Sequence, residues 1–372
     1  MKILHLLPSL KRRGAQIFVR DLIYALAERD DIEQLLVVFT SGVDEVGMKD
    51  VFGRVEFLPD GNSLGKIIAL RSAIHVIRPD IIFSHGAEPL KFGVLACGTG
   101  IRPKIIYRKI GLSEQWLGRY RWLKLPFQRW LISRADLILA VGKTMRQEVI
   151  DLFRAVPNKI RVVYQGFDHI QFALPEGTRE RTRNALGIAL NSKVLISVGT
   201  LAWEKNQASM IQVLAKVRQS YSNVVLVLVG DGPERRKLEN LTYDLDMTDA
   251  VKFLGLRNDV PKLLTASDIF LLTSLTEGVP GVLIEAGMAG LPCVTWNVAG
   301  AREVVKNKES GLVTPYKDES AFVAAVINLL EDQNLCEQMG TVAQSFCQKR
   351  FNMKHCSSEH VKLFKCILSR HG

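Results

Sequence analysis

Short apolar segments alternate with amphipathic helical patterns along most of the chain, and this alternation most constrains its fold. In the first half, helical patterns such as 15–28 and 64–77 lie between most of the apolar segments, which include 3–7, 35–39, 55–58, 81–84, 104–107, 137–141 and 160–163. A strand that is apolar throughout is buried on both faces. The pattern therefore predicts a parallel sheet covered by helices on both sides.

The same alternation restarts in the second half, with apolar segments at 194–199, 224–229, 251–253, 269–273, 293–296 and 311–313. Between the halves, the segment 164–176 has no clear periodicity and indicates a linker. The 372 residues are also too many for one ordinary core. We expect an α/β protein with two Rossmann-like doubly wound domains facing across a cleft, at 1–165 and 166–352. A C-terminal helix in 353–372 is expected to pack back on the first domain.

The segment TEGVPGVLIEAGMAG, residues 276–290, carries the strongest local signal. It follows an apolar strand, and ligands bind at the carboxyl ends of strands in such sheets. Gly281 starts a predicted helix after a Gly-Val-Pro turn, and the free N–H groups there suit a phosphate. Glu277 and Glu285 flank that position and can accept hydrogen bonds from hydroxyls. From the spacing alone, an acidic capping turn in which Glu285 forms a salt bridge fits equally well.

This segment resembles the E-x7-E motif of retaining GT-B glycosyltransferases, above all those of family 4. The resemblance implies that Glu277 contacts the donor sugar and takes part in catalysis. It also implies that Glu285 holds the ribose hydroxyls, and that the backbone of Gly281 and Val282 meets the sugar and the diphosphate. The likeness is dense from about 197 to 315 and loose in the first domain.

Three further donor-site residues follow from the same resemblance. In SVGTLAWEKNQ, residues 197–207, Lys205 falls on the family's diphosphate-binding lysine, which acts in catalysis. Thr200 stands where the family has an arginine and is likewise expected at the diphosphate, but it carries no charge, so part of the usual charge there must come from elsewhere. The backbone near Gly255 is expected beside the base. Without the resemblance, Lys205 would more often be a solvated surface lysine.

In the first domain, the loop 8–16 follows the first strand. Family members often carry a Gly-Gly pair there that meets the donor diphosphate or the acceptor. Gly14 fits the second of these glycines and Arg13 replaces the first. Arg12 and Arg13 can add the charge that Thr200 lacks, because arginine suits phosphates. A solvent-facing basic loop is the alternative.

His85 ends the apolar segment IIFSH, residues 81–85, and is expected to point into the cleft as a third catalytic residue. The alternative is a hydrogen-bonded histidine of the core. A second histidine that the family often uses in catalysis is replaced here by Lys109 or Ile110. Arg108 or Lys109 can instead bind an acidic acceptor.

The net charge of +11 favours anionic partners. Most of the excess lies in 102–134, which has nine Lys or Arg residues against Glu114 alone, interleaved with Trp116, Tyr120, Trp122, Phe127 and Trp130. Such a segment suits a membrane interface or single-stranded nucleic acid. The alternative is a buried aromatic helix with a basic outer face. Pro126 predicts a helix, a turn and a second helix.

The sequence lacks the motifs typical of dinucleotide-binding enzymes, metal sites, disulfide-bonded proteins, secreted proteins and membrane-spanning proteins. A dinucleotide-type G-x-G-x-x-G is absent from the first loop, and no metal-binding Asp pair stands at a strand end. The six cysteines form no disulfide or zinc pattern, which is typical of a reducing compartment. The N-terminus is a poor signal peptide, and no apolar run reaches the roughly 18 residues of a membrane span.

We therefore predict a retaining glycosyltransferase with a nucleoside-diphosphate sugar donor and no metal or other cofactor. Its acceptor is expected to be a glycan or a lipid-linked molecule, in cell-surface glycan, lipopolysaccharide or glycolipid synthesis. The protein is expected in the cytoplasm, peripheral on an anionic membrane surface through 102–134, and without a nucleic-acid partner. The alternatives are a nucleotide-sugar epimerase of the same fold and a non-catalytic basic protein that binds nucleic acid or lipid.

Overall fold

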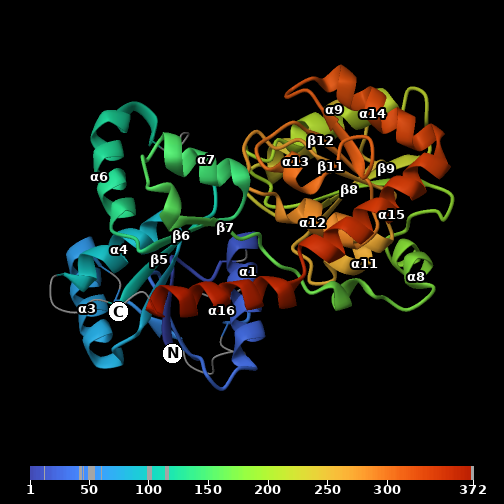
Figure 1. Ribbon diagram of the computed structural model, residues 1–372. Helices are drawn as coiled ribbons and strands as arrows, with labels where there is room; N and C mark the ends of the chain where they lie inside the picture. The colour runs from blue at the N-terminus through green and yellow to red at the C-terminus, as the bar shows by residue number, and fades with distance from the viewer. Residues whose placement is uncertain are drawn as a thin grey trace. The chain divides into compact units, whose positions relative to one another are not determined.

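The structure is a computed structural model that describes residues 1–11, 13–41, 44, 46–48, 55–59, 61–98, 103–113 and 117–369. The chain divides into two compact units (Figure 1). Unit 1 comprises Met1–Phe167 with Met353–Gly372, and unit 2 comprises Asp168–Asn352. Each unit is described below by itself.

Unit 1 contains a parallel sheet. Among the described residues its strand order is β3 (Glu56–Phe57), β2 (Glu33–Val38), β1 (Lys2–Leu7), β4 (Ile81–His85), β5 (Lys104–Lys109), β6 (Leu137–Ala140) and β7 (Ile160–Val162). The order reverses between β1 and β4, so the loops after these two strands diverge to opposite sides. Such a point is where ligands bind in open α/β sheets.

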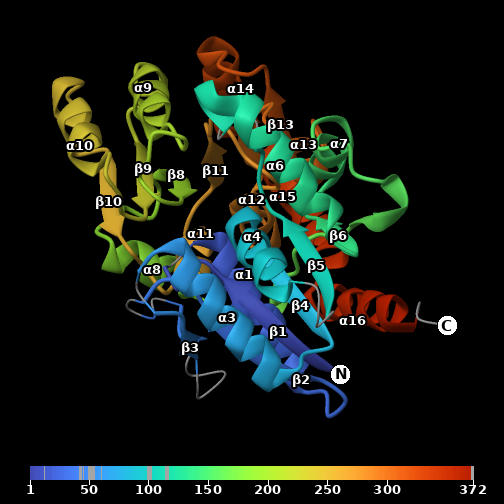
Figure 2. The ribbon, with the colours of Figure 1, turned by 90° about the vertical axis from the view of Figure 1, so that its left-hand side faces the viewer.

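Helices cover both faces of this sheet. On one face, α1 (Gly14–Ala27) lies beside α16 (Met353–Ser369), and the apolar side chains beneath them include Ile3, Phe83 and Phe364 (Figure 1). On the other face, α3 (Ser63–Ile77) and α4 (Ala87–Cys97) pack on each other and cover a second core that includes Leu4 and Ile82 (Figure 2). The period-2 alternation of strand side chains explains why neighbouring residues enter different cores.

Unit 2 repeats the architecture. Its parallel sheet has the order β10 (Val251–Gly255), β9 (Val224–Val229), β8 (Lys193–Val198), β11 (Ile269–Leu272), β12 (Cys293–Trp296) and β13 (Gly311–Thr314). Two helix pairs pack on it: α9 (Gln207–Val217) with α14 (Glu319–Glu331), and α12 (Gly281–Met288) with α15 (Gln333–Arg350). The strand order reverses between β8 and β11. The predicted fold class, two Rossmann-like α/β domains, is confirmed.

One sequence prediction about an element is wrong. Pro126 was expected to separate two helices, but it lies inside a single helix, α6 (Arg121–Ser133), which follows a 3-10 turn at Gly118–Tyr120. A proline removes the hydrogen bond to the carbonyl four residues earlier and its ring crowds that carbonyl, but here both effects fall on Trp122 in the first turn of the helix. The helix therefore continues past it.

In the part of the chain that the structure describes, no helix is both long and apolar enough to span a bilayer.

Candidate functional site

The site in unit 2 is built from the loops after β8 and β11, the two strands at which the order reverses. The backbone N–H of Leu275 donates to the carbonyl of Glu204 at 2.7 Å, and the Thr273 hydroxyl donates to the carbonyl of Asn206 at 2.8 Å. These bonds tie the two loops together directly after their strands. The side chains that follow on each loop are therefore held next to one another.

Lys205 and Glu277 meet across these loops. The Lys205 ammonium donates to Glu277 Oε1 at 2.6 Å, and the two side chains are 26% and 11% exposed. A carboxylate as buried as this one is costly to ionise unless a cation compensates it. The structure thus brings together the two residues predicted to act on the sugar and the diphosphate.

The turn after Glu277 leads into α12. Pro280 precedes the helix with an extended backbone (φ −67°, ψ 105°), and Gly281 and Val282 are its first two residues. The first N–H groups of a helix have no acceptor within the helix. Glu285 lies one turn further along the same helix and is half-buried. The helix start therefore offers N–H donors between the two acidic residues, as the motif predicts.

Glycines let backbone segments around the site approach closely. A Cβ on Gly300, which has φ +70°, would lie 2.0 Å from the carbonyl oxygen of Gly278 in the turn before α12. A Cβ on Gly230, with φ +131°, would lie 2.0 Å from the carbonyl oxygen of Gly199 at the end of β8. Only glycine avoids these overlaps. These two glycines, which the sequence analysis did not single out, serve the packing of the loops on one another.

The remaining donor residues of the prediction lie in the same unit. Thr200 is exposed just after β8, and its carbonyl accepts a bond from the Gln207 side chain at 3.0 Å. Gly255 ends β10 with φ +66°, and its carbonyl accepts from the N–H of Gly230 at 2.8 Å. Their predicted contacts with the diphosphate and the base stay predictions.

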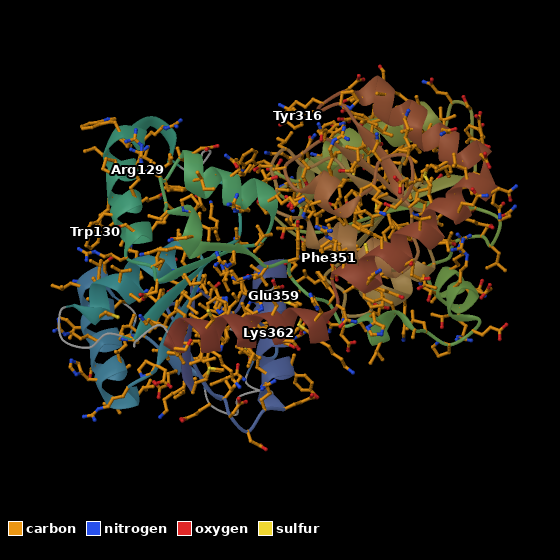
Figure 3. All side chains as sticks on the ribbon, in the orientation of Figure 1. Arg129, Trp130, Tyr316, Phe351, Glu359 and Lys362 are labelled. Atoms are coloured by element: carbon orange, nitrogen blue, oxygen red, sulfur yellow. The ribbon has the colours of Figure 1, made fainter. Side chains whose placement is uncertain are left out.

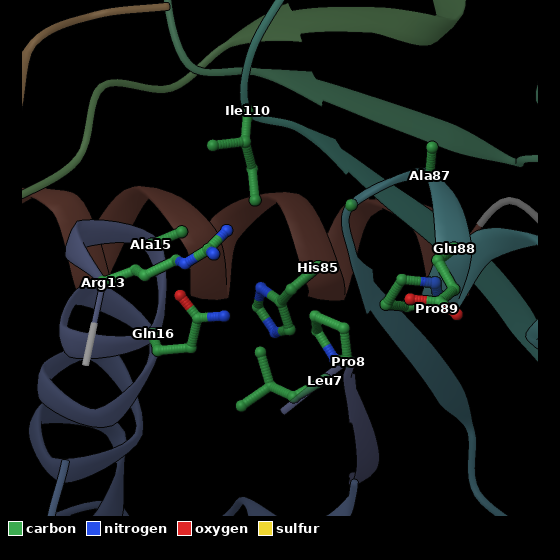
Figure 4. Close-up of a pocket in the computed structure, with 11 residues that line it drawn as sticks. Leu7, Pro8, Arg13, Ala15, Gln16, His85, Ala87, Glu88, Pro89 and Ile110 are labelled. Carbon is green, nitrogen blue, oxygen red and sulfur yellow. The ribbon is translucent and has the colours of Figure 1, made fainter. Parts of the chain in front are cut away.

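Unit 1 has a pocket of about 420 Å³ at the carboxyl ends of β1 and β4. Its walls include Arg13 at the start of α1, Glu88 at the start of α4, and Ile110 after β5. Gln16 and His85 lie deeper, and Figure 4 shows these two side chains turned toward the same space as Arg13. Gly14 is exposed at the first position of α1, between two residues that line the pocket. The pocket therefore adjoins both first-domain residues of the predicted site, Gly14 and His85.

His85 is almost completely buried and belongs to a line of hydrogen-bonded side chains. Its Nε2 lies 3.1 Å from Nδ1 of His5, and Nε2 of His5 lies 3.2 Å from Oε1 of Gln34. The Gln34 amide nitrogen donates to the carbonyl of Ile23 at 3.0 Å. Burial lowers the pKa of His5 to about 3 and holds the pKa of His85 well below its usual range. Both imidazoles are therefore neutral at physiological pH.

His85 matches one of the two predictions, and its catalytic role stays a prediction. It is a hydrogen-bonded core histidine, the alternative reading, and it also lines the pocket. His5 and Gln34 did not stand out in the sequence. The one signal was a histidine within the apolar first strand.

Lys109 is buried and paired within unit 1, which contradicts the expectation that it binds an acidic acceptor. Its ammonium lies 2.5 Å from a Glu148 oxygen and 2.6 Å from the Ser113 hydroxyl, and it also donates to the carbonyl of Gly111. These partners tie β5 to α7 (Lys143–Asp151) and to the loop after β5.

Arg108 is buried on the opposite face of β5. Its guanidinium carbon lies 3.9 Å from the ring centre of Phe18, and burial lowers its pKa to about 9. Neither terminal nitrogen has a hydrogen-bond partner among the described residues. Arg108 therefore sits beneath α1 and does not reach the surface.

The basic and aromatic segment forms an exposed surface on α6 (Figure 3). Trp122 is 71% exposed, Phe127 45% and Trp130 40%, so the alternative of a buried aromatic helix is wrong. Arg121 and Lys124 are exposed on the same helix. Because Arg108 and Lys109 are buried, the surface charge is smaller than the count over 102–134 indicated. Arg12, Glu114, Trp116 and the side chain of Arg119 lie outside the described residues.

Two family models match the chain. Glycosyltransferase Family 4 matches residues 12–171, and Glycosyl transferases group 1 matches residues 178–346. N-acetyl-alpha-D-glucosaminyl L-malate synthase of Bacillus anthracis is 30% identical over 241 residues, which are 64% of this chain and 62% of that protein. The alignment thus spans less than two thirds of that relative's length.

Two further proteins extend the comparison. UDP-Gal:alpha-D-GlcNAc-diphosphoundecaprenol alpha-1,3-galactosyltransferase of Escherichia coli is 28% identical over 278 residues, 72% of this chain and 71% of that protein. The crystal structure of HepE from Anabaena in complex with UDP superposes with a TM-score of 0.88 at 25% identity, covering 98% of this chain and all of that one. The family matches in both units, together with the two-sheet architecture, show that the chain belongs to the GT-B glycosyltransferases of family 4 and group 1.

Proposed function

We propose that the protein transfers a sugar from a nucleoside-diphosphate sugar to an acceptor, with retention of the anomeric configuration. The observation that carries the proposal is the Lys205–Glu277 pair, held beside the N-terminus of α12. The E-x7-E resemblance supports retention. The Anabaena complex makes a uridine nucleotide the first donor to test.

The pair and the helix start suit the breaking of a sugar–diphosphate bond. Negative charge grows on the leaving diphosphate as that bond breaks. The Lys205 ammonium and the N–H groups of Gly281 and Val282 can stabilise this charge without a metal. Lys205 donates to Oε1 of Glu277, so Oε2 can accept a hydrogen bond from a hydroxyl of the sugar. Glu285 lies one helical turn further along α12 and, in this proposal, accepts hydrogen bonds from the ribose hydroxyls.

For the acceptor we propose a glycan or a lipid-linked molecule that enters the pocket of unit 1. The Escherichia coli relative is named for a diphosphoundecaprenol-linked acceptor, and the Bacillus anthracis relative for malate. The pocket borders on Arg13 and on the N-termini of α1 and α4. These groups favour an anionic acceptor, whereas Glu88 in the wall opposes one.

We further propose that α6 holds the protein on an anionic membrane surface on the cytoplasmic side. Exposed aromatic rings can insert at the headgroup level, and nearby Arg and Lys side chains attract anionic lipid. Trp122, Phe127 and Trp130 supply the rings, and Arg121 and Lys124 the charges. This surface would bring the enzyme to cell-surface glycan, lipopolysaccharide or glycolipid synthesis.

The comparisons do not favour the two alternatives, an epimerase and a non-catalytic binding protein. Both would still need to be separated from a transferase in solution. An epimerase would convert the donor without consuming an acceptor. A non-catalytic basic protein would bind nucleic acid with a steep salt dependence and would not bind the nucleotide sugar.

Calorimetry with UDP tests the donor site. Glu285→Ala should weaken binding about tenfold or more, because a hydrogen bond to a charged group is worth about 1.5–3 kcal/mol. Glu309→Ala is the matched control, since Glu309 is exposed and pairs with Lys306 at 3.7 Å. Equal affinity of the Glu285 variant and the wild type would remove Glu285 from the site.

A further inference from the structure

The hydrogen bonds that lead to His85 have only one possible direction. The carbonyl of Ile23 can only accept, so the group that reaches it must be the Gln34 amide nitrogen. The other atom of that amide, Oε1, therefore faces His5 and can only accept. His5 must carry its proton on Nε2, and its Nδ1 is bare because the ring is neutral. His85 must then donate from Nε2 to His5.

This direction of the hydrogen bonds determines the state of the other nitrogen of His85, Nδ1. A neutral imidazole that donates from Nε2 has a lone pair on Nδ1. That nitrogen has no hydrogen-bond partner among the described residues, although the side chain is 2% exposed. A buried polar atom without a partner costs free energy unless a ligand or water satisfies it.

Gln16 lines the same pocket as His85, and its amide nitrogen is turned toward the His85 ring (Figure 4). Gln16 is 6% exposed, and its Oε1 likewise has no partner among the residues described. Both side chains face the space that Figure 4 shows between α1 and the end of β4. The unpaired Nδ1 of His85 favours a ligand group that donates a hydrogen bond to it.

We propose that Gln34 and His5 are positioning residues that hold His85 with Nδ1 as an acceptor, and that this nitrogen binds a hydroxyl of the sugar acceptor. The identity of the ligand as the acceptor rests on the proposed function. The hydrogen-bond line itself does not. Its physical effect is to orient the hydroxyl, whose O–H donates to the unprotonated His85 Nδ1 while the lone pairs on its oxygen stay free.

The protonation of His85 can be read directly by NMR. Long-range ¹H–¹⁵N imidazole spectra distinguish a protonated from an unprotonated nitrogen, and the His85 signals are assigned by their loss in His85→Gln. In the wild type, His85 Nδ1 should resonate as an unprotonated nitrogen and Nε2 as a protonated one, unchanged between pH 6 and 8. A proton on Nδ1 would overturn the proposal, and this measurement requires no folded Gln34 variant.

Gln34→Glu should reverse the direction of the hydrogen bond between His5 and His85. A carboxylate next to His5 Nε2 favours the imidazolium form, in which His5 Nδ1 also carries a proton and donates to His85 Nε2. The proton of His85 must then move to Nδ1. Gln34→Met is the matched control, because it also loses the bond to Ile23 but adds no charge. A proton on His85 Nε2 in the folded Gln34→Glu variant would contradict the role of Gln34.

Two small probes test the ligand chemistry in the same spectra. Glycerol can donate hydrogen bonds, whereas its trimethyl ether can only accept, and both are small enough for the pocket. In the wild type, glycerol should shift the His85 Nδ1 signal saturably and the ether should not. In Gln34→Glu, the ether should shift it too, because Nδ1 has become a donor.

Equal shifts of the His85 Nδ1 signal by both probes in the wild type, or no shift by either, would contradict the proposal that this nitrogen binds a hydroxyl. Neither experiment uses a sugar donor or turnover. Their failure is therefore distinguishable from failure of the proposed transferase activity, which calorimetry with UDP and the Glu285 variant reports separately.

Discussion

Lys205 and Glu277 show how a pair of side chains gains a role from its surroundings. Each is a common surface residue type, and only the pairing of β8 with β11 brings their loops together. Glu277 is buried enough to need a cation, and Lys205 supplies it. In the proposed function, the same ammonium is preorganised to stabilise the charge that develops on the leaving diphosphate.

Lys205→Ala should lower kcat by about a hundredfold or more, which is the usual effect of removing one group that stabilises transition-state charge. The measurement is release of UDP from UDP-sugars with and without acceptor. Lys216→Ala removes a comparable pair, with Glu319 at 2.9 Å, from an exposed position on α9 and should leave turnover unchanged. Near-normal kcat in Lys205→Ala would mean that other groups, such as Arg13, neutralise the diphosphate.

Among the elements, α6 carries an exposed cluster of aromatic and basic side chains. Phe127 and Trp130 stack with ring centres 5.9 Å apart, and the guanidinium of Arg134 lies 5.4 Å from the Trp130 ring centre. Aromatic side chains that remain in water forgo the free energy that burial of their apolar surface would provide. On α6 these exposed rings lie on the same helix as exposed Lys and Arg side chains. A membrane interface satisfies both the rings and the charges.

The double variant Arg121→Glu/Lys124→Glu should bind anionic vesicles about thirtyfold more weakly or worse, because each Lys or Arg near such a surface contributes about 1 kcal/mol. Co-sedimentation with anionic and neutral vesicles measures this. Arg236→Glu/Lys237→Glu changes the charge equally at exposed positions of α10 (Arg235–Asp244) and should bind like the wild type.

Salt should weaken wild-type vesicle binding, since it screens exposed charges. Equal binding to neutral and anionic vesicles, or none to either, would contradict the membrane proposal. It would leave a soluble acceptor as the partner of the enzyme.

At the scale of the whole molecule, the C-terminal helix completes the core of the unit in which the chain begins. Phe364 is fully buried, with its ring centre 5.5 Å from that of Phe83 on β4. Lys365 also pairs with Asp31 at 2.7 Å. Unit 1 therefore cannot close its core until the last helix has been made, although its sheet comes from the start of the chain.

Phe364→Ala should destabilise unit 1 by about 3–5 kcal/mol, the usual cost of truncating a buried phenylalanine. Hydrogen exchange should show faster exchange in β1 and β4, while β8 and β11 in unit 2 keep their protection. Tyr243→Ala, at a position 79% exposed on α10, should change stability by less than about 0.5 kcal/mol. Equal loss of protection in both units would show that the effect is not confined to the core of unit 1.

The sequence by itself determined the fold class and the donor motif. Apolar strands between amphipathic helices are a local pattern, and a parallel sheet buried on both faces is the one arrangement that satisfies it. The residues of the donor motif are close in sequence from Glu277 to Glu285, so their placement at a helix start followed from the turn and the proline. Lys205 was found through its resemblance to a family segment, because a lysine after a strand carries no such signal alone.

Tertiary structure decided what depends on residues distant in the chain. The ion pair of Lys109 with Glu148 joins residues 39 positions apart, so the sequence does not reveal that Lys109 is buried. The exposure of the aromatic rings on α6 likewise depends on which elements pack against that helix. The line from Gln34 through His5 to His85 exists because β1 pairs with β2 on one side and with β4 on the other. Strand order is set by the packing of whole elements, and no local pattern encodes it. The chemical state of His85 therefore followed from the assembled sheet.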